Sequence, residues 1–256
     1  TLLCDDSPTR PTYPSPQWTF GVKAEHKAQK THRRRFCSIY PPDHPRGDTE
    51  VFQRVIHMKQ HIILASGSDI RATLLRNAGL EFDVIVPRVD EQTMTQSLIA
   101  EAASPRDIAD ALAEMKALRV AAKNPDALVI GCDQVLAHGR ELVSKPQTPE
   151  QAIAQLKSLR GQTHQLLSAA VVFAGGKPQW RHVGQTRLFM KDVSDAYLDA
   201  YVARNWDSIR HAVGAYKLEE EGARLFSRVE GDYFNVLGIP LLELLSYLTL
   251  RGTIDG

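Results

Sequence analysis

The sequence predicts an α/β fold, in which short buried strands alternate with helices. Two apolar runs of strand length, 61–65 and 127–132, are bounded by small or polar residues. Ser104-Pro105 and Thr148-Pro149 each place a helix-capping side chain directly before a proline, which suits the first turn of a helix. Strands and capped helices in alternation are typical of the α/β class.

Residues that end or connect helices and strands mark the other elements along the chain. Gly161 interrupts an apolar pattern and predicts a helix end, and Gly175-Gly176 predicts a turn between two strands. A hairpin is expected around His138-Gly139. The expected helices are 70–78, one that begins at Pro105, 149–159, one capped by Ser194, and 240–250; the further apolar or strand-like runs are 82–86, 166–173, 180–190 and 224–229.

Residues 1–57 differ from the rest of the chain. They show no helical or strand periodicity, they contain the basic run Lys27 to Arg35, and they hold many prolines, namely Pro8, Pro11, Pro14, Pro16, Pro41, Pro42 and Pro45. We expect this segment to be a disordered extension. The first methionine is Met58, so we expect the functional protein to begin there and residues 58–256 to form one domain.

Composition excludes several classes of function. The 256 residues are 43% hydrophobic and 24% charged, with a formal net charge of +1, so nothing global indicates a nucleic-acid or membrane partner. No apolar run is long enough to span a bilayer. The three cysteines, Cys4, Cys37 and Cys132, lack zinc-site spacing. We therefore expect free thiols in a cytoplasmic protein.

The stretch HIILASGSDIR, 61–71, predicts a strand, a small-residue loop and a helix start. The N-terminus of a helix presents free backbone N–H groups and a partial positive charge. Ser66, Ser68 and Arg71 beside it make an anion-binding site plausible on chemical grounds. The alternative is an ordinary connection between strand and helix, with Ser68 or Asp69 as the cap.

Further polar residues follow other predicted elements. Asp133 comes directly after the buried run 127–132, Lys116 borders the apolar stripe of a helix, and Lys145 precedes a proline. Each has a structural alternative, a turn aspartate or a solvated lysine. Taken together, the set has the cations, hydroxyls and carboxylates of a metal-assisted phosphate site; it comprises Ser66, Ser68, Arg71, Glu91, Lys116, Asp133 and Lys145.

Six motifs in this chain resemble, in order, those of the Maf family of septum-formation-inhibitor-like nucleotide pyrophosphatases. LASGSDIRATLL resembles the family's opening LAS-x-S-P-R-R-x-x-LL, and GDYFNVLGIPL resembles its closing NV-x-GLP. The four motifs between them are VDE at 89–91, ALAEMKA at 111–117, GCDQVL at 131–136 and SKPQTPEQA at 144–152. The resemblance covers about Met58 to Leu250. One departure is that the family's P-R-R reads Asp69-Ile70-Arg71 here, so one arginine is missing.

The resemblance implies a cytoplasmic enzyme that depends on magnesium, with manganese as an alternative metal. Such an enzyme hydrolyses a nucleoside triphosphate between the α and β phosphates and so removes modified or non-canonical nucleotides. The implied fold is a mixed sheet wrapped by helices, with two lobes and a deep nucleotide-binding cleft, and family members are commonly homodimers.

The resemblance also implies roles for the residues of the set. Asp133 would be the general base or would orient the attacking water on the metal, and Glu91 would help to hold the metal. The remaining five, Ser66, Ser68, Arg71, Lys116 and Lys145, would bind the triphosphate.

Base specificity is expected at three positions that match the family's pattern. These are Gln134, Ile70 and Glu219. Gln134 and Glu219 resemble the members that act on 7-methyl-GTP, whereas the pyrimidine-preferring members carry Thr, Arg and Gln at the three positions. An ionised carboxylate accepts from the adjacent N1–H and N2–H₂ donors of guanine, whereas uracil and thymine present carbonyl oxygens there. The structural alternative is that Glu219 is one of three adjacent exposed acids, Glu219-Glu220-Glu221.

Two other functions are consistent with parts of the sequence. The chain could be a nucleotide-binding regulator of cell division without turnover, although a pure binder needs no carboxylates beside phosphates. It could instead bind nucleic acid through the basic run 27–35, although the near-neutral net charge argues against this.

Overall fold

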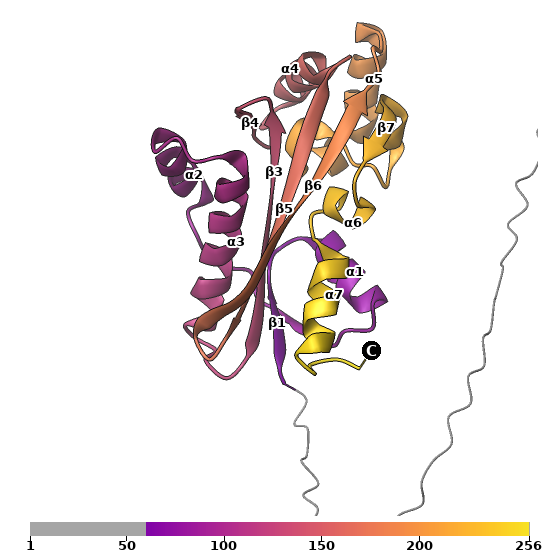
Figure 1. Ribbon diagram of the computed structural model, residues 1–256. Helices are drawn as coiled ribbons and strands as arrows, with labels where there is room; N and C mark the ends of the chain where they lie inside the picture. The colour runs from indigo at the N-terminus through magenta and orange to yellow at the C-terminus, as the bar shows by residue number, and fades with distance from the viewer. Residues whose placement is uncertain (1–59, 256) are drawn as a thin grey trace, which may run out of the picture. The chain divides into compact units, whose positions relative to one another are not determined.

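The computed structural model describes residues 60–255. Their strands form one mixed seven-stranded sheet (Figure 1). The strand order is β2-β1-β3-β5-β6-β7, and β4 pairs with β3 off this path. β1 is parallel to both β2 and β3, and every other pairing is antiparallel. The strands are β1 Ile62–Ala65, β2 Asp83–Val84, β3 Leu128–His138, β4 Glu141–Val143, β5 Thr163–Ala174, β6 Lys177–Met190 and β7 Phe226–Glu230.

The helices follow the capping signals of the sequence. The hydroxyls of Ser104, Thr148 and Ser194 each accept a hydrogen bond from a backbone N–H three residues later, as predicted. The helices are α1 Asp69–Asn77, α2 Glu91–Ala100, α3 Pro105–Ala121, α4 Pro149–Leu159, α5 Asp195–Ile209, α6 Tyr233–Val236 and α7 Leu241–Leu250, with 3₁₀ turns η1 Val213–Ala215 and η2 Glu221–Leu225. The expected α/β class is confirmed.

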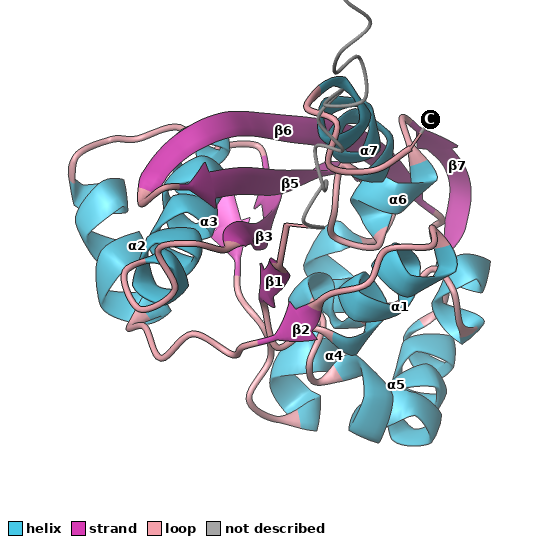
Figure 2. Ribbon diagram, turned by 90° about the horizontal axis from the view of Figure 1, so that it is seen from below, coloured by secondary structure: helices cyan, strands magenta, loops and turns pink. Residues whose placement is uncertain are grey.

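Helices cover both faces of the sheet, and the alternation of side chains along β3 decides what each face contacts. Val129 packs in a cluster with α3, whereas Ile130 and Cys132 pack with α1 and α7. Further along the strand, Leu136 packs with α4 and α5. Figure 1 shows α3 on one side of the sheet and α1 with α7 on the other. Figure 2 shows α6 beside α7, where it also contacts β5 and β6.

Asp133 does not end its strand, and this corrects the prediction. β3 continues to His138 because β5 pairs with it as far as Ala137 and β4 pairs with its last residues. The strand that stops near Asp133 is the parallel neighbour β1, whose last pair is Ala65 with Gly131. Asp133 therefore lies just beyond the carboxyl end of β1, at the kind of position where open α/β sheets bind ligands.

Smaller differences from the prediction concern local geometry. Only Asp83–Val84 of the apolar run 82–86 pairs as a strand, at the edge of the sheet. The expected strand 224–229 begins later, at Phe226, because the chain before it forms η2. No helix within residues 60–255 is both long and apolar enough to cross a membrane. The predicted extension 1–57, its basic run, the start at Met58, and the thiols of Cys4 and Cys37 lie outside the described residues.

Candidate active site

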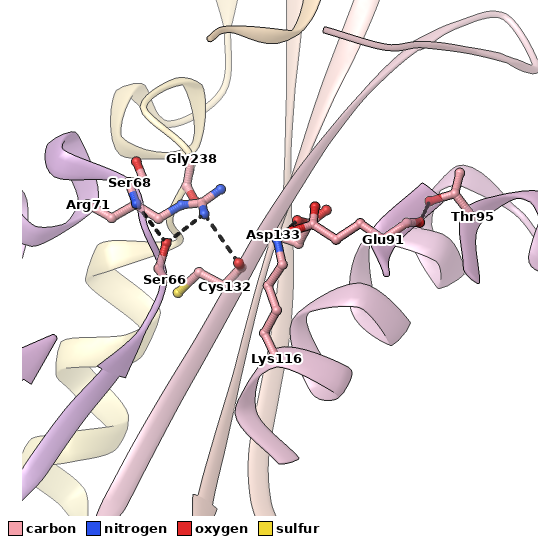
Figure 3. Close-up of polar contacts among 9 residues, drawn as sticks. All are labelled: Ser66, Ser68, Arg71, Glu91, Thr95, Lys116, Cys132, Asp133 and Gly238. Carbon is pink, nitrogen blue, oxygen red and sulfur yellow. Dashed lines mark hydrogen bonds and ion pairs between the residues drawn. The ribbon is translucent and has the colours of Figure 1, made fainter. Parts of the chain in front are cut away.

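The loop after β1 and the first turn of α1 build what we call the arginine cluster, formed by Ser66, Arg71, Cys132 and Gly238 (Figure 3). Arg71 is buried; its Nε donates to the Gly238 carbonyl at 2.7 Å. Its Nη1 donates to Ser66 Oγ at 3.1 Å and to the Cys132 carbonyl at 3.2 Å. All three acceptors are neutral, so the cluster keeps the positive charge of the guanidinium. Nη2 has no hydrogen-bond partner within residues 60–255, which leaves N–H donors for an anion.

Gly238 lets the chain after α6 approach Arg71 closely. Its φ is +97°, in the region that favours glycine, and a Cβ there would lie 3.1 Å from both Nε and Nη2 of Arg71. The closing motif of the sequence therefore has a physical function. It delivers a carbonyl oxygen that orients the arginine of the opening motif.

A second set of charges, which we call the lysine cluster, consists of Glu91, Lys116 and Asp133. Lys116 Nζ lies 2.5 Å from Asp133 Oδ1 and 3.0 Å from Glu91 Oε1. The side chains of Lys116 and Asp133 are less than one-tenth exposed, whereas that of Glu91 is 47% exposed. With all three groups ionised, this cluster carries a net charge of minus one.

The close approach of α3 to β3 places Lys116 beside Asp133. A Cβ at Gly131 would lie 2.3 Å from the carbonyl oxygen of Ala113 and 2.6 Å from the nitrogen of Ala117, both in α3. Any larger residue at Gly131 would force the helix away. Glu91 reaches the cluster from the first turn of α2, where Asp90 caps the helix by accepting from Thr93 N.

The two clusters meet at consecutive residues of β3. The carbonyl of Cys132 accepts from Arg71, and the side chain of the next residue, Asp133, pairs with Lys116. A site with positive and negative charge side by side can hold an anion and a cation together. A nucleoside triphosphate with its metal is such a pair.

Burial changes the proton affinity of two groups on β3. It raises the pKa of Asp133 above its usual range, although the cations of Lys116 and Arg71 oppose the change. A carboxylate with a raised pKa is a better proton acceptor at neutral pH. Burial also raises the pKa of Cys132 to about 11, which keeps the thiol protonated and excludes it as a nucleophile.

Other predicted phosphate ligands have looser geometry. Ser68 caps α1 without a side-chain hydrogen bond, and its backbone N–H donates to Ser66 Oγ at 3.2 Å. The Ser68 hydroxyl is thus without a partner among the described residues. Asp69 opens α1 but is not its cap. Lys145 is exposed between β4 and α4, and no contact within residues 60–255 joins its ammonium to either cluster.

The residues predicted to read the base lie on different elements. Gln134 faces away from Asp133, and its amide nitrogen donates to Ser168 Oγ and to the carbonyls of Asn235 and Val236, which ties β3 to α6. Its Oε1 has no hydrogen bond within residues 60–255. Ile70 is half-buried against the hydrophobic cluster of α1 and α7. Glu219 is exposed on the segment between η1 and η2.

The predicted metal ligands are the carboxylates of Glu91 and Asp133. Within residues 60–255 there is no group of three or more His, Cys, Asp or Glu side chains that could hold a metal ion. Glu91 and Asp133 supply carboxylate oxygens around one point, which Lys116 now occupies. Magnesium commonly uses one or two carboxylates and completes its shell with substrate phosphates and water, so this pair fits a metal that arrives with a nucleotide.

Sequence reasoning missed two parts of the site, the carbonyls of Cys132 and Gly238 and the helix α2. Backbone acceptors leave no signal in residue type. The start of α2 did leave one, since Asp90 is followed by an acidic residue and then by Thr93, a pattern typical of a capped first turn. The expected deep cleft stays a prediction, because the cavities of about 380 and 290 Å³ are lined by residues outside both clusters.

Comparison with known proteins agrees with the motifs. The family model described as Maf-like protein matches residues 61–250. A Ruegeria pomeroyi protein named nucleoside triphosphate pyrophosphatase is 64% identical over 194 residues, which are 76% of this chain and 98% of that protein. A Brucella abortus protein named 7-methyl-GTP pyrophosphatase is 43% identical over 199 residues, 78% of this chain and 100% of that protein. A solved nucleoside-triphosphatase (dITP/XTP pyrophosphatase) from Mycobacterium abscessus is 12% identical over 77% of this chain and 98% of its own, with a TM-score of 0.34, too low to support an inference.

Proposed function

Because the chain belongs to the Maf-like protein family, we propose that it is a nucleoside triphosphate pyrophosphatase that hydrolyses its substrate between the α and β phosphates. Relatives that carry this name are 61% and 64% identical to it over nearly their full length. The observation that carries the proposal is the junction of the arginine and lysine clusters at Cys132 and Asp133. It combines an anion site with a buried carboxylate whose pKa is raised.

In the proposed reaction, a water oxygen bonds to the α phosphorus and the bond from that phosphorus to the bridging oxygen breaks. The products are the nucleoside monophosphate and pyrophosphate. Asp133 accepts the proton of the water, for which its raised pKa is suited. The free N–H groups of Arg71 and the hydroxyls of Ser66 and Ser68 stabilise negative charge on the phosphates. Lys145 is proposed to approach the phosphates from the loop before α4.

We propose that Glu91 and Asp133 hold a divalent metal, magnesium or manganese. When bound, the metal lowers the pKa of its water and neutralises phosphate charge. A metal held by these two side chains would compete with Lys116, whose ammonium lies within 3.0 Å of an oxygen of each carboxylate. With its carboxylate partners held by a metal, the Lys116 ammonium would be able to contact a phosphate.

The preferred base is proposed to be guanine, with 7-methyl-GTP as the substrate. Two observations support this. The Brucella abortus relative is named 7-methyl-GTP pyrophosphatase. Glu219 has no hydrogen bond or ion pair within residues 60–255, so its carboxylate is available to N1–H and N2–H₂ of guanine. The half-buried Ile70 leaves an apolar surface in place of the family's arginine, which tolerates a base methyl group.

The activity is tested by a panel of nucleotides with detection of pyrophosphate, in magnesium, in manganese and in chelator. We expect 7-methyl-GTP or GTP to be hydrolysed faster than dTTP or UTP, and Glu219→Gln to reduce the difference. A wild-type preference for dTTP or UTP would show that the carboxylate does not read guanine. Nucleotide binding without pyrophosphate release under any condition would favour the alternative, a non-catalytic regulator.

The expected homodimer and the expected lack of a stable nucleic-acid partner stay predictions. Light scattering of the purified protein would measure the first. A gel-shift assay at several salt concentrations would measure the second, because binding through basic residues weakens steeply as salt rises.

A further inference from the structure

Three adjacent acids, Glu219 to Glu221, lie between η1 and the first residue of η2, and the structure separates them by their partners. Glu220 accepts from Ser208 Oγ at 2.7 and 2.9 Å and pairs with Lys217 at 3.1 Å. Glu221 accepts from Arg204 Nη2 at 2.6 Å and from Asn205 Nδ2 at 2.8 Å. Glu219, in contrast, has no such contact within residues 60–255. Two of the three carboxylates therefore hold the segment in place, and one is left for a ligand.

The hydrogen-bond donors that hold these two acids from outside the segment belong to one helix, and Arg224 of η2 adds a longer ion pair to Glu221 at 3.7 Å. Arg204, Asn205 and Ser208 lie in the last two turns of α5, so they project from neighbouring positions of the same surface. Lys217 also donates to Ser208 Oγ at 2.7 Å, which joins the start of the segment to the same helix. The bonds flank Glu219 on both sides in sequence, at Lys217 and at Glu220.

The beginning of the segment is fixed by the core. Tyr216 is buried, and its hydroxyl lies 2.7 Å from Nε2 of His164 in β5. The preceding residue, Ala215, has a φ of +58°, which is uncommon for a residue with a side chain and is kept only where the surroundings enforce it. Leu218 packs against the same hydrophobic cluster. The backbone on both sides of Glu219 is thus held in one conformation.

We propose that α5 positions Glu219 for base recognition through Arg204 and Ser208, which are positioning residues and do not touch the nucleotide. The proposal rests on the proposed function, in particular on contact between Glu219 and guanine. A carboxylate that accepts two adjacent donors must hold a defined direction, and a loose segment would lose the discrimination before it lost the hydrolysis. Arg204 and Ser208 should therefore affect the choice of nucleotide more than the rate on a poor one.

The test is a double-mutant cycle in the full chain. The ratio of kcat/KM for 7-methyl-GTP or GTP to that for UTP is measured in wild type, in Glu219→Gln, in the pair Arg204→Gln with Ser208→Ala, and in all three changes together. We expect the pair to lower the ratio roughly three- to thirtyfold, as for coupled residues of one network, with little change for UTP. In the Glu219→Gln background the pair should have no further effect. Arg204→Lys, which keeps a charge, should restore part of the ratio.

Arg181→Gln is the matched control. Arg181 is exposed to a similar degree and likewise forms an ion pair, but it lies on β6 and its carboxylate partners, Asp110 and Glu114, lie on α3. It should leave the ratio unchanged. Hydrogen exchange of the backbone amides 217–221 supplies a readout independent of turnover, and exchange should be faster in the Arg204 and Ser208 pair than in Arg181→Gln.

The outcomes separate the two proposals. If Glu219→Gln lowers the ratio and the Arg204 and Ser208 pair does not, or if the pair acts equally in the Glu219→Gln background, the positioning proposal is overturned and the base assignment stands. If Glu219→Gln leaves the ratio unchanged while pyrophosphate is released, both the base assignment and the positioning proposal are overturned and the hydrolytic activity stands. Equal exchange in the pair and in Arg181→Gln also overturns the positioning proposal.

Discussion

The arginine cluster and the lysine cluster use a buried cation in opposite ways. Among the described residues, Arg71 bonds only to neutral acceptors, two backbone carbonyls and one hydroxyl, so its charge remains available to an incoming anion. Lys116 bonds to two carboxylates, so its charge is more than cancelled. The first arrangement is the one that we propose for phosphate binding. In the second, the lysine would become available to phosphate only if a metal took its place on the two carboxylates, as we propose.

This difference explains why two cationic side chains, Arg71 and Lys116, can lie near each other in one site. The net charge of the arginine cluster is positive and that of the lysine cluster is negative, so the clusters attract rather than repel. A magnesium nucleotide presents charges of both signs and so matches the pair. Each cluster can be broken separately, which lets the comparison be tested.

The largest effect is expected from Asp133→Asn in the lysine cluster. The amide keeps the size of the side chain but cannot accept the proton, and the loss of a general base typically lowers turnover about 10²–10⁴-fold. Stability should fall much less than on loss of a whole ion pair, because the asparagine oxygen still accepts from Lys116 and Glu91 remains the ion-pair partner of that lysine. Initial rates of pyrophosphate release and thermal unfolding measure both quantities. Asp110→Asn, on α3 and paired with Arg181, is the control and should keep its activity. Retention of more than half the activity in Asp133→Asn would remove it from catalysis.

Lys116→Met should destabilise the protein. It should also leave the carboxylates of Glu91 and Asp133 without their cationic partner. Removal of one partner from a buried ion pair typically costs about 3–5 kcal/mol, because the other charge is left uncompensated. The double variant Lys116→Met with Asp133→Asn should recover most of this loss. Manganese should bind more tightly to Lys116→Met than to wild type in the absence of nucleotide, by calorimetry. Equal or weaker metal affinity would contradict the competition between metal and ammonium.

Acid sensitivity of folding should come from a region outside both clusters. Burial, with a contribution from His138, lowers the pKa of His164 to about 4, whereas an unfolded histidine titrates near 6.5. The unfolded chain therefore binds more protons between these values, so stability is complete above about pH 6.5 and falls by about 3 kcal/mol towards pH 4. Urea unfolding across this range measures the slope. His164→Gln should flatten it and Tyr216→Phe should keep it; an unchanged slope in His164→Gln would refute the assignment.

Arg71→Lys should give a smaller loss that is the same for every base. A lysine cannot bond to Gly238, Ser66 and Cys132 at once and still offer N–H groups to phosphate. A lost charge-assisted hydrogen bond costs roughly 1.5–3 kcal/mol, so kcat/KM should fall about 10- to 100-fold for purine and pyrimidine nucleotides alike. Arg76→Lys on the exposed side of α1 is the control. A loss confined to one base would place Arg71 in base recognition instead.

The sequence by itself determined where most helices and strands lie and which residues are candidates for the site. Helix starts at Ser104, Thr148 and Ser194 were predictable because a cap acts on a backbone N–H only three residues away. Ser66, Arg71 and Asp133 were recognisable by residue type next to such elements, and the family followed from motif order. Signals of this kind act within one turn or one strand.

Only the tertiary structure decided how those residues are used, because the deciding contacts join distant parts of the chain. Arg71 meets a carbonyl 167 residues later, and Lys116 reaches Asp133 because α3 packs directly on Gly131. β3 extends beyond Asp133 because β5 pairs with it, which local sequence does not encode. The three adjacent acids are equivalent in sequence, and the partners supplied by α5 leave Glu219 alone without a hydrogen bond or ion pair in the part of the chain that the structure describes.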